Sequence, residues 1–343
     1  MLVYVTAFSL SIIFAEMGMQ TRSYREGNRR RVAMVSMLPI FYIAAFRYMV
    51  GSDYPAYRAI YQRIANGSKE DVEWLFFWLN KLLTKLGLHY VWLFIVCALI
   101  FLIPTYLHIF EYSPYPTMSI LLLFGTTYYF AFQNVMRQFM GAAVLLYALR
   151  YIEEEKPIKY FTLVFIAAGF HQTSLLFLPI YFLRKIDLTP MKAAAIAFLV
   201  FIFSDPIGRL ITYILNQTRY ASYSTESGDV YMVRFLIQVS VLLLTSVYRN
   251  KNDRFRIYYW IQFIGTCGVG FGNIVSHAHR LVWTFGFPSI IFIPMAIREI
   301  RIRRDRVTVA IITCLCFIVY ALYILLEFGG FDGLPYQFIF EHL

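Results

Sequence analysis

The stretch "VWLFIVCALIFLIPTYLHIFE", residues 91–111, carries one charged side chain, which stands at its last position. About 20 apolar residues in an α-helix are enough to cross the hydrocarbon core of a bilayer. Similar apolar runs recur along the whole chain. Of its 343 residues, 59% are hydrophobic and 15% are charged, whereas a soluble domain has about a quarter charged residues. The sequence therefore predicts an all-α, polytopic integral membrane protein.

We expect roughly 10–11 transmembrane helices in a single membrane domain that occupies residues 1–343. The predicted spans are residues 2–18, 32–50, 91–111, 118–133, 136–152, 191–204, 231–248, 257–275, 281–297 and 307–327. The apolar stretch 161–183 is a further candidate.

The net charge of +11 comes largely from short basic loops between these spans, at residues 22–31, 248–256 and 298–306. Such loops follow the positive-inside rule and predict a cytoplasmic position, so the charge does not indicate a nucleic-acid partner. The loops 51–90 and 205–230 are then expected on the outer side of the membrane.

This topology leaves the stretch 161–183 with a parity problem, because a single crossing there would place the basic loop 248–256 outside. A broken or re-entrant helix pair that turns near Gly169–His171 restores the expected orientation. A miscounted span near residues 118–152 would restore it equally well, so both interpretations stay open.

The outer loop 51–90 contains a helical pattern at residues 71–88. Apolar side chains, among them Trp74, Trp78 and Leu82, recur at near-helical spacing, and the lysines are expected on the opposite face. The pattern is typical of an amphipathic helix that lies on the membrane surface, although a short span of marginal hydrophobicity has the same length.

Ionisable residues within or at the ends of membrane spans are costly and mark candidate functional positions. Arg47 lies near the end of the span 32–50, with Asp53 and Tyr54 shortly after it. An ion pair between Arg47 and Asp53, or an arginine directed at a phosphate, is one interpretation. The alternative is that Arg47 extends its side chain to the lipid headgroups.

Arg137 and Gln138 lie between two apolar stretches, where a guanidinium and amide groups suit a diphosphate or a sugar. A plain polar turn is the alternative. His171 lies in the middle of an apolar run and is a candidate general base or a buried structural histidine. Arg280 follows "SHAH" (276–279), whose two histidines lack the further ligands of a metal site. We therefore expect no metal and no other cofactor.

These residues carry a resemblance to a known family. "FRYMVGSDYPAY" (46–57) resembles the R-x(3,4)-G-x-D-Y signature of the EpsG family, the Wzy-like exopolysaccharide and capsule polymerases, and Glu73 resembles its acidic position. "MRQFMGAAVLLYALRYIEEEKPIKY" (136–160) is similar to its R-Q-x-(L/F)-A segment, although Ala142 stands two positions too far along. "FHQTSLLFLP" (170–179) and "HRLVWTFGFP" (279–288) resemble its later motifs.

The resemblance implies a GT-C-like membrane glycosyltransferase, which acts as a polysaccharide polymerase on the outer face of the bacterial cytoplasmic membrane. Its substrate would be an undecaprenyl-diphosphate-linked oligosaccharide, and the growing chain would pass to the non-reducing end of the next repeat unit. A chain-length regulator and other polysaccharide-export proteins would be its partners, besides the lipid bilayer.

Chemistry then suggests a role for each residue. Arginines would stabilise the departing diphosphate, with Arg137 and Arg280 preferred over Arg47, and the attacking hydroxyl would need His171 or Asp53 as its base. The residues expected to contact the diphosphate or sugar also include Gln138, Glu73 and Tyr54. Tyr54, Tyr57 and Trp74 are candidates to stack on sugar faces, and an interfacial aromatic belt is the alternative.

Three other functions fit parts of the pattern. A membrane acyltransferase would use an intramembrane histidine but leave the outer arginines unexplained. A lipid-linked oligosaccharide ligase would share the donor. A flippase would predict charges along a central path and an internal repeat, which the sequence lacks.

Overall fold

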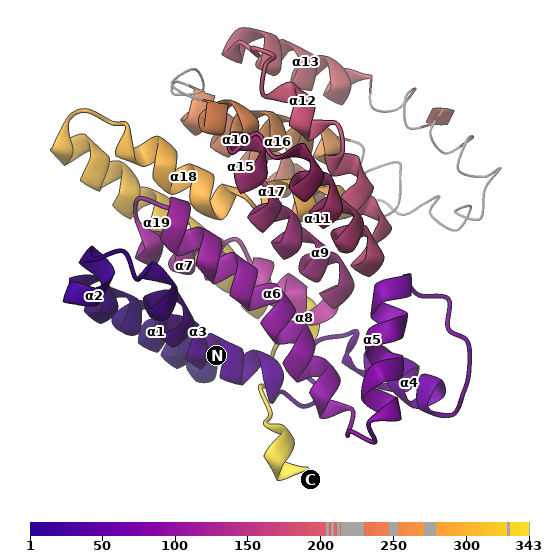
Figure 1. Cartoon of the computed structure of the whole chain (residues 1–343). Coiled ribbons are helices and arrows are strands. Elements are labelled where there is room, and N and C mark those ends of the chain that lie inside the picture. The colour runs from indigo at the N-terminus through magenta and orange to yellow at the C-terminus, as the bar shows by residue number, and fades with distance from the viewer. Residues whose placement is uncertain are drawn as a thin grey trace.

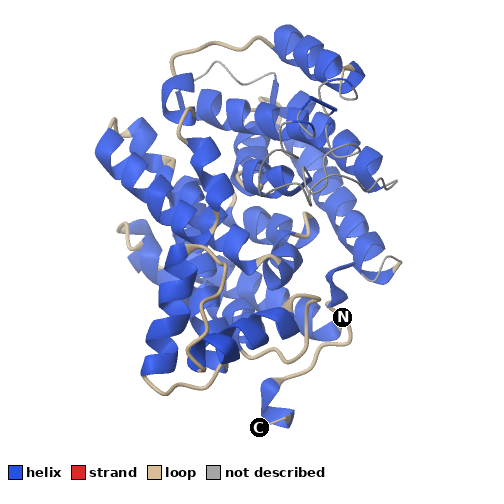
Figure 2. Ribbon diagram, turned by 90° about the vertical axis from the view of Figure 1, so that its right-hand side faces the viewer, coloured by secondary structure: helices blue, strands red, loops and turns tan. Residues whose placement is uncertain are grey.

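The computed structural model describes residues 1–203, 230–246, 253–270, 279–327 and 330–342, together with residues 206, 209, 210 and 213. Throughout these residues the regular secondary structure is helical (Figures 1 and 2). The predicted outer loop 205–230 lies for the most part outside the described residues. Within these described residues, four helices are long and apolar enough to cross a membrane: Leu2–Gln20, Val91–Tyr112, Leu281–Arg298 and Arg303–Leu326. Several shorter apolar helices accompany them, which confirms the predicted class of multi-pass membrane protein.

The helices follow one another along the chain with few long connections. Their bounds are α1 (Leu2–Gln20), α2 (Arg22–Arg25), α3 (Arg29–Ala45), α4 (Tyr54–Ala65), α5 (Trp74–Lys85), α6 (Val91–Tyr112), α7 (Pro116–Gly125), α8 (Tyr128–Asn134), α9 (Met136–Ala148), α10 (Arg150–Glu153), α11 (Pro157–Phe170), η1 (Gln172–Phe177), α12 (Ile180–Leu183), α13 (Pro190–Ile202), α15 (Val230–Ser246), α16 (Asp253–Gly270), α17 (His279–Gly286), α18 (Ser289–Arg298), α19 (Arg303–Leu326), η3 (Gly330–Asp332) and η4 (Ile339–Glu341).

The first helices form a closely packed layer, in which α1 lies on α3 and α3 lies on α6 (Figure 1). Buried hydroxyl groups join the three helices. Ser11 donates to the carbonyl of Ser36 at 2.6 Å and lies 2.7 Å from the Tyr106 hydroxyl. These bonds satisfy polar groups that would otherwise be costly inside an apolar bundle.

The stretch 161–183 is a helical hairpin that reverses direction at His171. The Tyr160 hydroxyl donates to the carbonyl of Phe177 at 2.6 Å, and the rings of Phe161 and Tyr181 lie 5.4 Å apart. Arg184, just after the returning leg, donates to the carbonyl of Ile152 at 3.0 Å. The hairpin therefore starts and finishes at the same end of the bundle, as the broken-helix interpretation of 161–183 predicts.

The predicted span 118–133 is also interrupted, because α7 ends before Thr126 and α8 begins after Thr127. Thr127 has φ +63°, a left-handed conformation that a threonine adopts at an energetic cost. Thr126 satisfies its hydroxyl by donating to the carbonyl of Leu122 at 2.6 Å. The apolar pattern could not show this break, because hydrophobic residues continue on both sides of it.

Ion pairs gather at the end of the bundle where α6 stops and α16 starts. Arg150 lies 2.7 Å from Glu111, and Arg254 donates from Nε and Nη2 to Glu153 at 2.7 and 2.6 Å. Arg29 donates to the carbonyl of Glu111 at 3.3 Å. We call this the basic end; it collects parts of two of the predicted cytoplasmic loops.

The opposite end carries the segment 46–53, which is held by the C-terminal tail. The amide of Tyr48 donates to the carbonyl of Gln337, and the amide of Ile339 donates to the carbonyl of Phe46, both at 2.9 Å. An isolated antiparallel bridge joins Arg47 to Phe338 between them. The first and last parts of the described chain therefore meet at this end.

The amphipathic helix predicted at residues 71–88 is α5, which at 12 residues is too short to span a bilayer. The apolar residues Trp74, Trp78 and Leu82 are exposed, whereas Phe76, Asn80 and Leu83 face inward. The lysines were expected on the opposite face, and that expectation is wrong: the Lys81 ammonium lies 4.9 Å from the centre of the Trp78 ring. Because Phe76 anchors the inner face, the tryptophans are left outside.

The turn after Arg47 offers a test of this packing. Gly51 has φ +98°, and a Cβ there would lie 2.8 Å from the carbonyl oxygen of Gln133, whereas Gly67 has φ +85° and open space around it. We expect Gly67→Ala to lower the free energy of unfolding by about 1 kcal/mol and Gly51→Ala to lower it by about 2–3 kcal/mol. Thermal unfolding of both variants in detergent measures the difference, and equal losses would contradict the close contact with α8.

Candidate functional site

Three side chains from different parts of the chain meet at the end of the bundle opposite the basic end. His171 Nδ1 lies 2.8 Å from Glu73 Oε1, and Arg137 Nη1 donates to Glu73 Oε2. Glu73 immediately precedes α5, Arg137 lies in the first turn of α9, and His171 forms the turn after α11. One carboxylate thus binds a guanidinium with one oxygen and an imidazole with the other.

Small residues allow the three supporting helices to approach one another. A Cβ at Gly169 would lie 2.8 Å from atoms of both Trp74 and Leu75, so α11 contacts the start of α5. A Cβ at Gly141 would lie 2.8 Å from the Ser174 hydroxyl, so α9 contacts η1. Close helix contacts at small residues are common in membrane proteins, and here they bring Glu73 within reach of His171.

The chain geometry also fixes the direction of His171. Its backbone is extended, with φ −156° and ψ 121°, which ends α11. Its amide donates to the carbonyl of Ala167 at 3.0 Å, and its carbonyl accepts from the amide of Ser174 at 3.0 Å. Because both backbone groups are bonded, the imidazole is held on a rigid turn.

The carboxylate decides which nitrogen of His171 carries a proton. Burial raises the pKa of Glu73, but the hydrogen bond with His171 and the positive charge of Arg137 outweigh it and hold that pKa below its ordinary value. An ionised carboxylate only accepts hydrogen bonds, so Nδ1 is the donor. In neutral His171, Nε2 is then the nitrogen that can accept a proton.

Aromatic residues pack against the Arg137 side chain. Its guanidinium lies 5.8 Å from the centre of the Phe76 ring, and the Phe76 and Tyr57 rings pack edge to face at 5.8 Å. Burial raises the pKa of the Tyr57 hydroxyl above its ordinary value, and the contact with Arg137 offsets only part of that rise. Tyr57 therefore packs behind Arg137. Of the three residues predicted to stack on sugars, Tyr54 and Tyr57 are buried and Trp74 is exposed.

Arg47 lies outside this cluster, in an aromatic cage. Its side chain is only 1% exposed, with Nη2 3.2 Å from the sulfur of Met136. The guanidinium lies 5.2 Å from the centre of the Phe94 ring and 5.9 Å from that of Tyr54. The predicted contact of Arg47 or Tyr54 with a substrate stays a prediction, and it would require this cage to open.

The remaining predicted residues occupy three other positions. Asp53 is half-buried at the residue before α4. Gln138 is buried and donates from Nε2 to the Thr284 hydroxyl at 2.9 Å. Arg280 belongs to α17, but its side chain lies outside the described residues, as does His277. The structure thus brings together Glu73, Arg137 and His171 and keeps Arg47 behind them.

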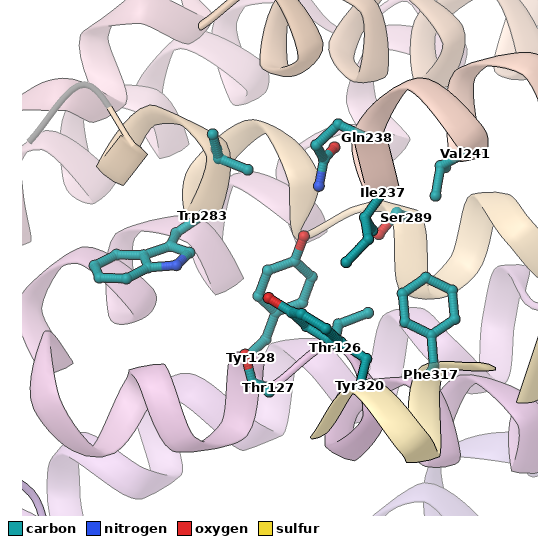
Figure 3. Close-up of a pocket in the computed structure, with 11 residues that line it drawn as sticks. Thr126, Thr127, Tyr128, Ile237, Gln238, Val241, Trp283, Ser289, Phe317 and Tyr320 are labelled. Atoms are coloured by element: carbon teal, nitrogen blue, oxygen red, sulfur yellow. The ribbon is translucent and has the colours of Figure 1, made fainter. Parts of the chain in front are cut away.

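A small polar cavity of about 30 Å³ lies deeper in the bundle, beside the break between α7 and α8. Figure 3 shows Gln238 above Tyr128, with Trp283 on one side and Phe317 on the other. A volume of this size holds about one water molecule and no sugar ring. The cavity therefore accounts for the broken helix at Thr127, since interrupted backbone at membrane depth is tolerated where it lines a polar space.

Fold and site together define a multi-pass helical membrane protein with a carboxylate–histidine–arginine cluster at one end. Comparison with known families gives a match to the EpsG family over residues 30–338, and the chain belongs to this family, which is linked to exopolysaccharide biosynthesis. No curated protein matches the chain. No solved structure matches it either, so the GT-C-like architecture stays a prediction.

The bonding of Glu73 predicts that Glu73→Gln and Glu70→Gln change the free energy of unfolding by different amounts. Glu73→Gln leaves the partly buried Arg137 without its anion, and we expect a loss of about 1–3 kcal/mol in the free energy of unfolding. Glu70 pairs with Arg63, whose side chain is 52% exposed, so Glu70→Gln should lower the free energy of unfolding by less than Glu73→Gln does. Thermal unfolding of both variants in detergent measures this, and an unchanged Glu73→Gln protein would contradict the assigned bonding.

Proposed function

We propose that this protein is a polysaccharide polymerase that joins undecaprenyl-diphosphate-linked oligosaccharide repeat units. The observation that carries the proposal is the contact between His171 Nδ1 and Glu73 Oε1 at 2.8 Å, which leaves Nε2 to act as a base. Membership of the EpsG family supports the same conclusion. Glu73 was expected to contact substrate; here we propose instead that it positions His171.

In the proposed reaction, a hydroxyl group at the non-reducing end of the incoming repeat unit attacks the anomeric carbon of the growing chain. The hydroxyl proton passes to Nε2 of His171 as the new glycosidic bond forms. The bond between the anomeric carbon and the diphosphate oxygen breaks, and undecaprenyl diphosphate leaves with the bonding electrons. Glu73 stabilises the imidazolium that results, as a carboxylate does in other histidine-based sites.

Arg137 has two roles in this proposal. One nitrogen holds Glu73, and since a guanidinium has five N–H donors, others remain for a diphosphate oxygen. Its side chain is 29% exposed, so a substrate can reach it. A pre-positioned cation near the breaking bond lowers the energy of the charged transition state. Arg280 remains a proposed second cation, and Asp53 remains the alternative base.

The proposed orientation of the protein in the membrane rests on the distribution of its arginines. The basic end collects arginines from several loops, and an excess of such residues favours the cytoplasmic side. The cluster of Glu73, Arg137 and His171 would then face the periplasm or the cell exterior, where lipid-linked repeat units are polymerised. No described feature favours the acyltransferase, ligase or flippase alternatives.

We expect His171→Ala to reduce polymerisation by about 10²–10⁴-fold, the usual contribution of a general base, and single lipid-linked repeat units to accumulate. His89 lies exposed between α5 and α6, so His89→Ala is the matched control and should leave polymer unchanged. The measurement is polymer length and the pool of lipid-linked repeats in cells with equal membrane levels of each variant. Normal polymer in the His171→Ala strain would rule out this residue as the base.

A further inference from the structure

Exposed apolar side chains of α5 and α11 lie side by side next to the candidate site. Trp74 and Trp78 on α5 are 58% and 56% exposed, and Phe165 on α11 is 57% exposed. Gly169 lies between them, and atoms of Trp74 come within 2.8 Å of where its Cβ would be. We call this surface, formed by Trp78, Trp74, Gly169, Ile166 and Phe165, the α5–α11 seam.

The seam follows one face of α11 away from the site. Gly169 follows Phe165 by four positions and Ile166 by three, so each of these two residues lies beside Gly169 on the helix surface. From His171 to Phe165 the helix descends about 9 Å at 1.5 Å per residue. Figure 1 shows α5 beside the end of α11, in agreement with the contacts between the two helices.

Both Glu73 and His171, the proposed catalytic pair, border this surface. Glu73 directly precedes Trp74, and His171 follows Gly169 by two residues. Two other apolar grooves, between α1 and α3 and between α15 and α19, have volumes of about 560 and 410 Å³. Neither is lined by Glu73, Arg137 or His171, whereas Trp74 and Gly169 of the seam lie within two positions of Glu73 and His171.

We propose that the α5–α11 seam holds the isoprenoid chain of the lipid-linked donor. This inference rests on the proposed function. A diphosphate alone separates the reacting anomeric carbon from the isoprenoid chain, so a donor bound at Glu73, Arg137 and His171 must leave its chain on an apolar surface that adjoins them. Trp74 covers the first part of the chain, and Phe165 and Ile166 guide it toward the bilayer.

Lys81 gives the seam a polar border. Its ammonium group lies 4.9 Å from the Trp78 ring centre and 5.8 Å from that of Phe77, a distance at which a cation is attracted to an aromatic face. This contact favours the observed orientation of the Trp78 indole. Ordering of the ring before an isoprenoid chain packs on it lowers the entropy lost on binding.

The test is photo-crosslinking with a benzophenone amino acid placed at Trp78 or Phe165 in the full-length protein carrying His171→Ala. The probe is an undecaprenyl-diphosphate-linked repeat unit with a radiolabelled sugar, in phospholipid vesicles. Matched positions are Leu38 in the α1–α3 groove and Leu315 on α19, which are similarly exposed. We expect several-fold more labelled adduct at Trp78 and Phe165 than at Leu38 and Leu315.

Equal labelling at all four positions would mean that the seam meets only bulk lipid, and a maximum at Leu38 would assign the chain to the α1–α3 groove; either result overturns the inference. Crosslinking needs no turnover, so it is separate from the polymer assay. Normal polymer in His171→Ala cells refutes the proposed role of His171 in polymerisation, whereas loss of polymer with the wrong labelling pattern refutes the seam alone.

A second variant gives a kinetic measure. Trp78→Ala removes exposed apolar contact area without touching Glu73 or His171, so we expect KM for the lipid-linked unit to rise about threefold to tenfold while kcat is unchanged. Leu315→Ala is the control. A fall in kcat with unchanged KM would show that Trp78 acts on the chemical step and not on the lipid chain.

Discussion

The bonding of one carboxylate holds the site together. Glu73 lies 64 positions from Arg137 and 98 positions from His171, and both are bound to it. Each partner begins or ends a different helix, so the carboxylate also fixes how α5, α9 and α11 meet. Removing the Glu73 carboxylate would leave the Arg137 charge uncompensated and the His171 Nδ1–H without its acceptor. The geometry of the site and the packing of the helices therefore depend on the same interaction.

Arg47 supports this arrangement from behind. It contacts Met136, the residue before Arg137, and lies among the rings of Phe94 and Tyr54. Its backbone is paired with the tail at Phe338. A buried cation is costly, and the aromatic faces offset part of that cost. Arg47, at the end of the predicted span 32–50, thus has a structural role: it joins the segment 46–51, the start of α9 and the tail.

The sequence predicted the membrane class and the family, because apolar runs, charged loops and ordered motifs are local features. It gave the hairpin near His171 as one of two interpretations, and the packing of 161–183 decides between them. It also selected Glu73, Arg137 and His171 as site residues. It could not show that Glu73 is the common partner, since that contact depends on how distant helices pack. It likewise missed the break at Thr127 and the position of Lys81 beside Trp78, which depend on the neighbours of each helix.

The most direct test of the account is a double-mutant cycle between His171→Ala and Glu73→Ala, read out as the polymerisation rate of the purified protein in vesicles. If Glu73 acts by positioning His171, the double variant is as slow as His171→Ala alone, because residues that act as a unit have non-additive effects. If the two losses multiply instead, Glu73 acts independently of the histidine, and the proposed catalytic pair is wrong.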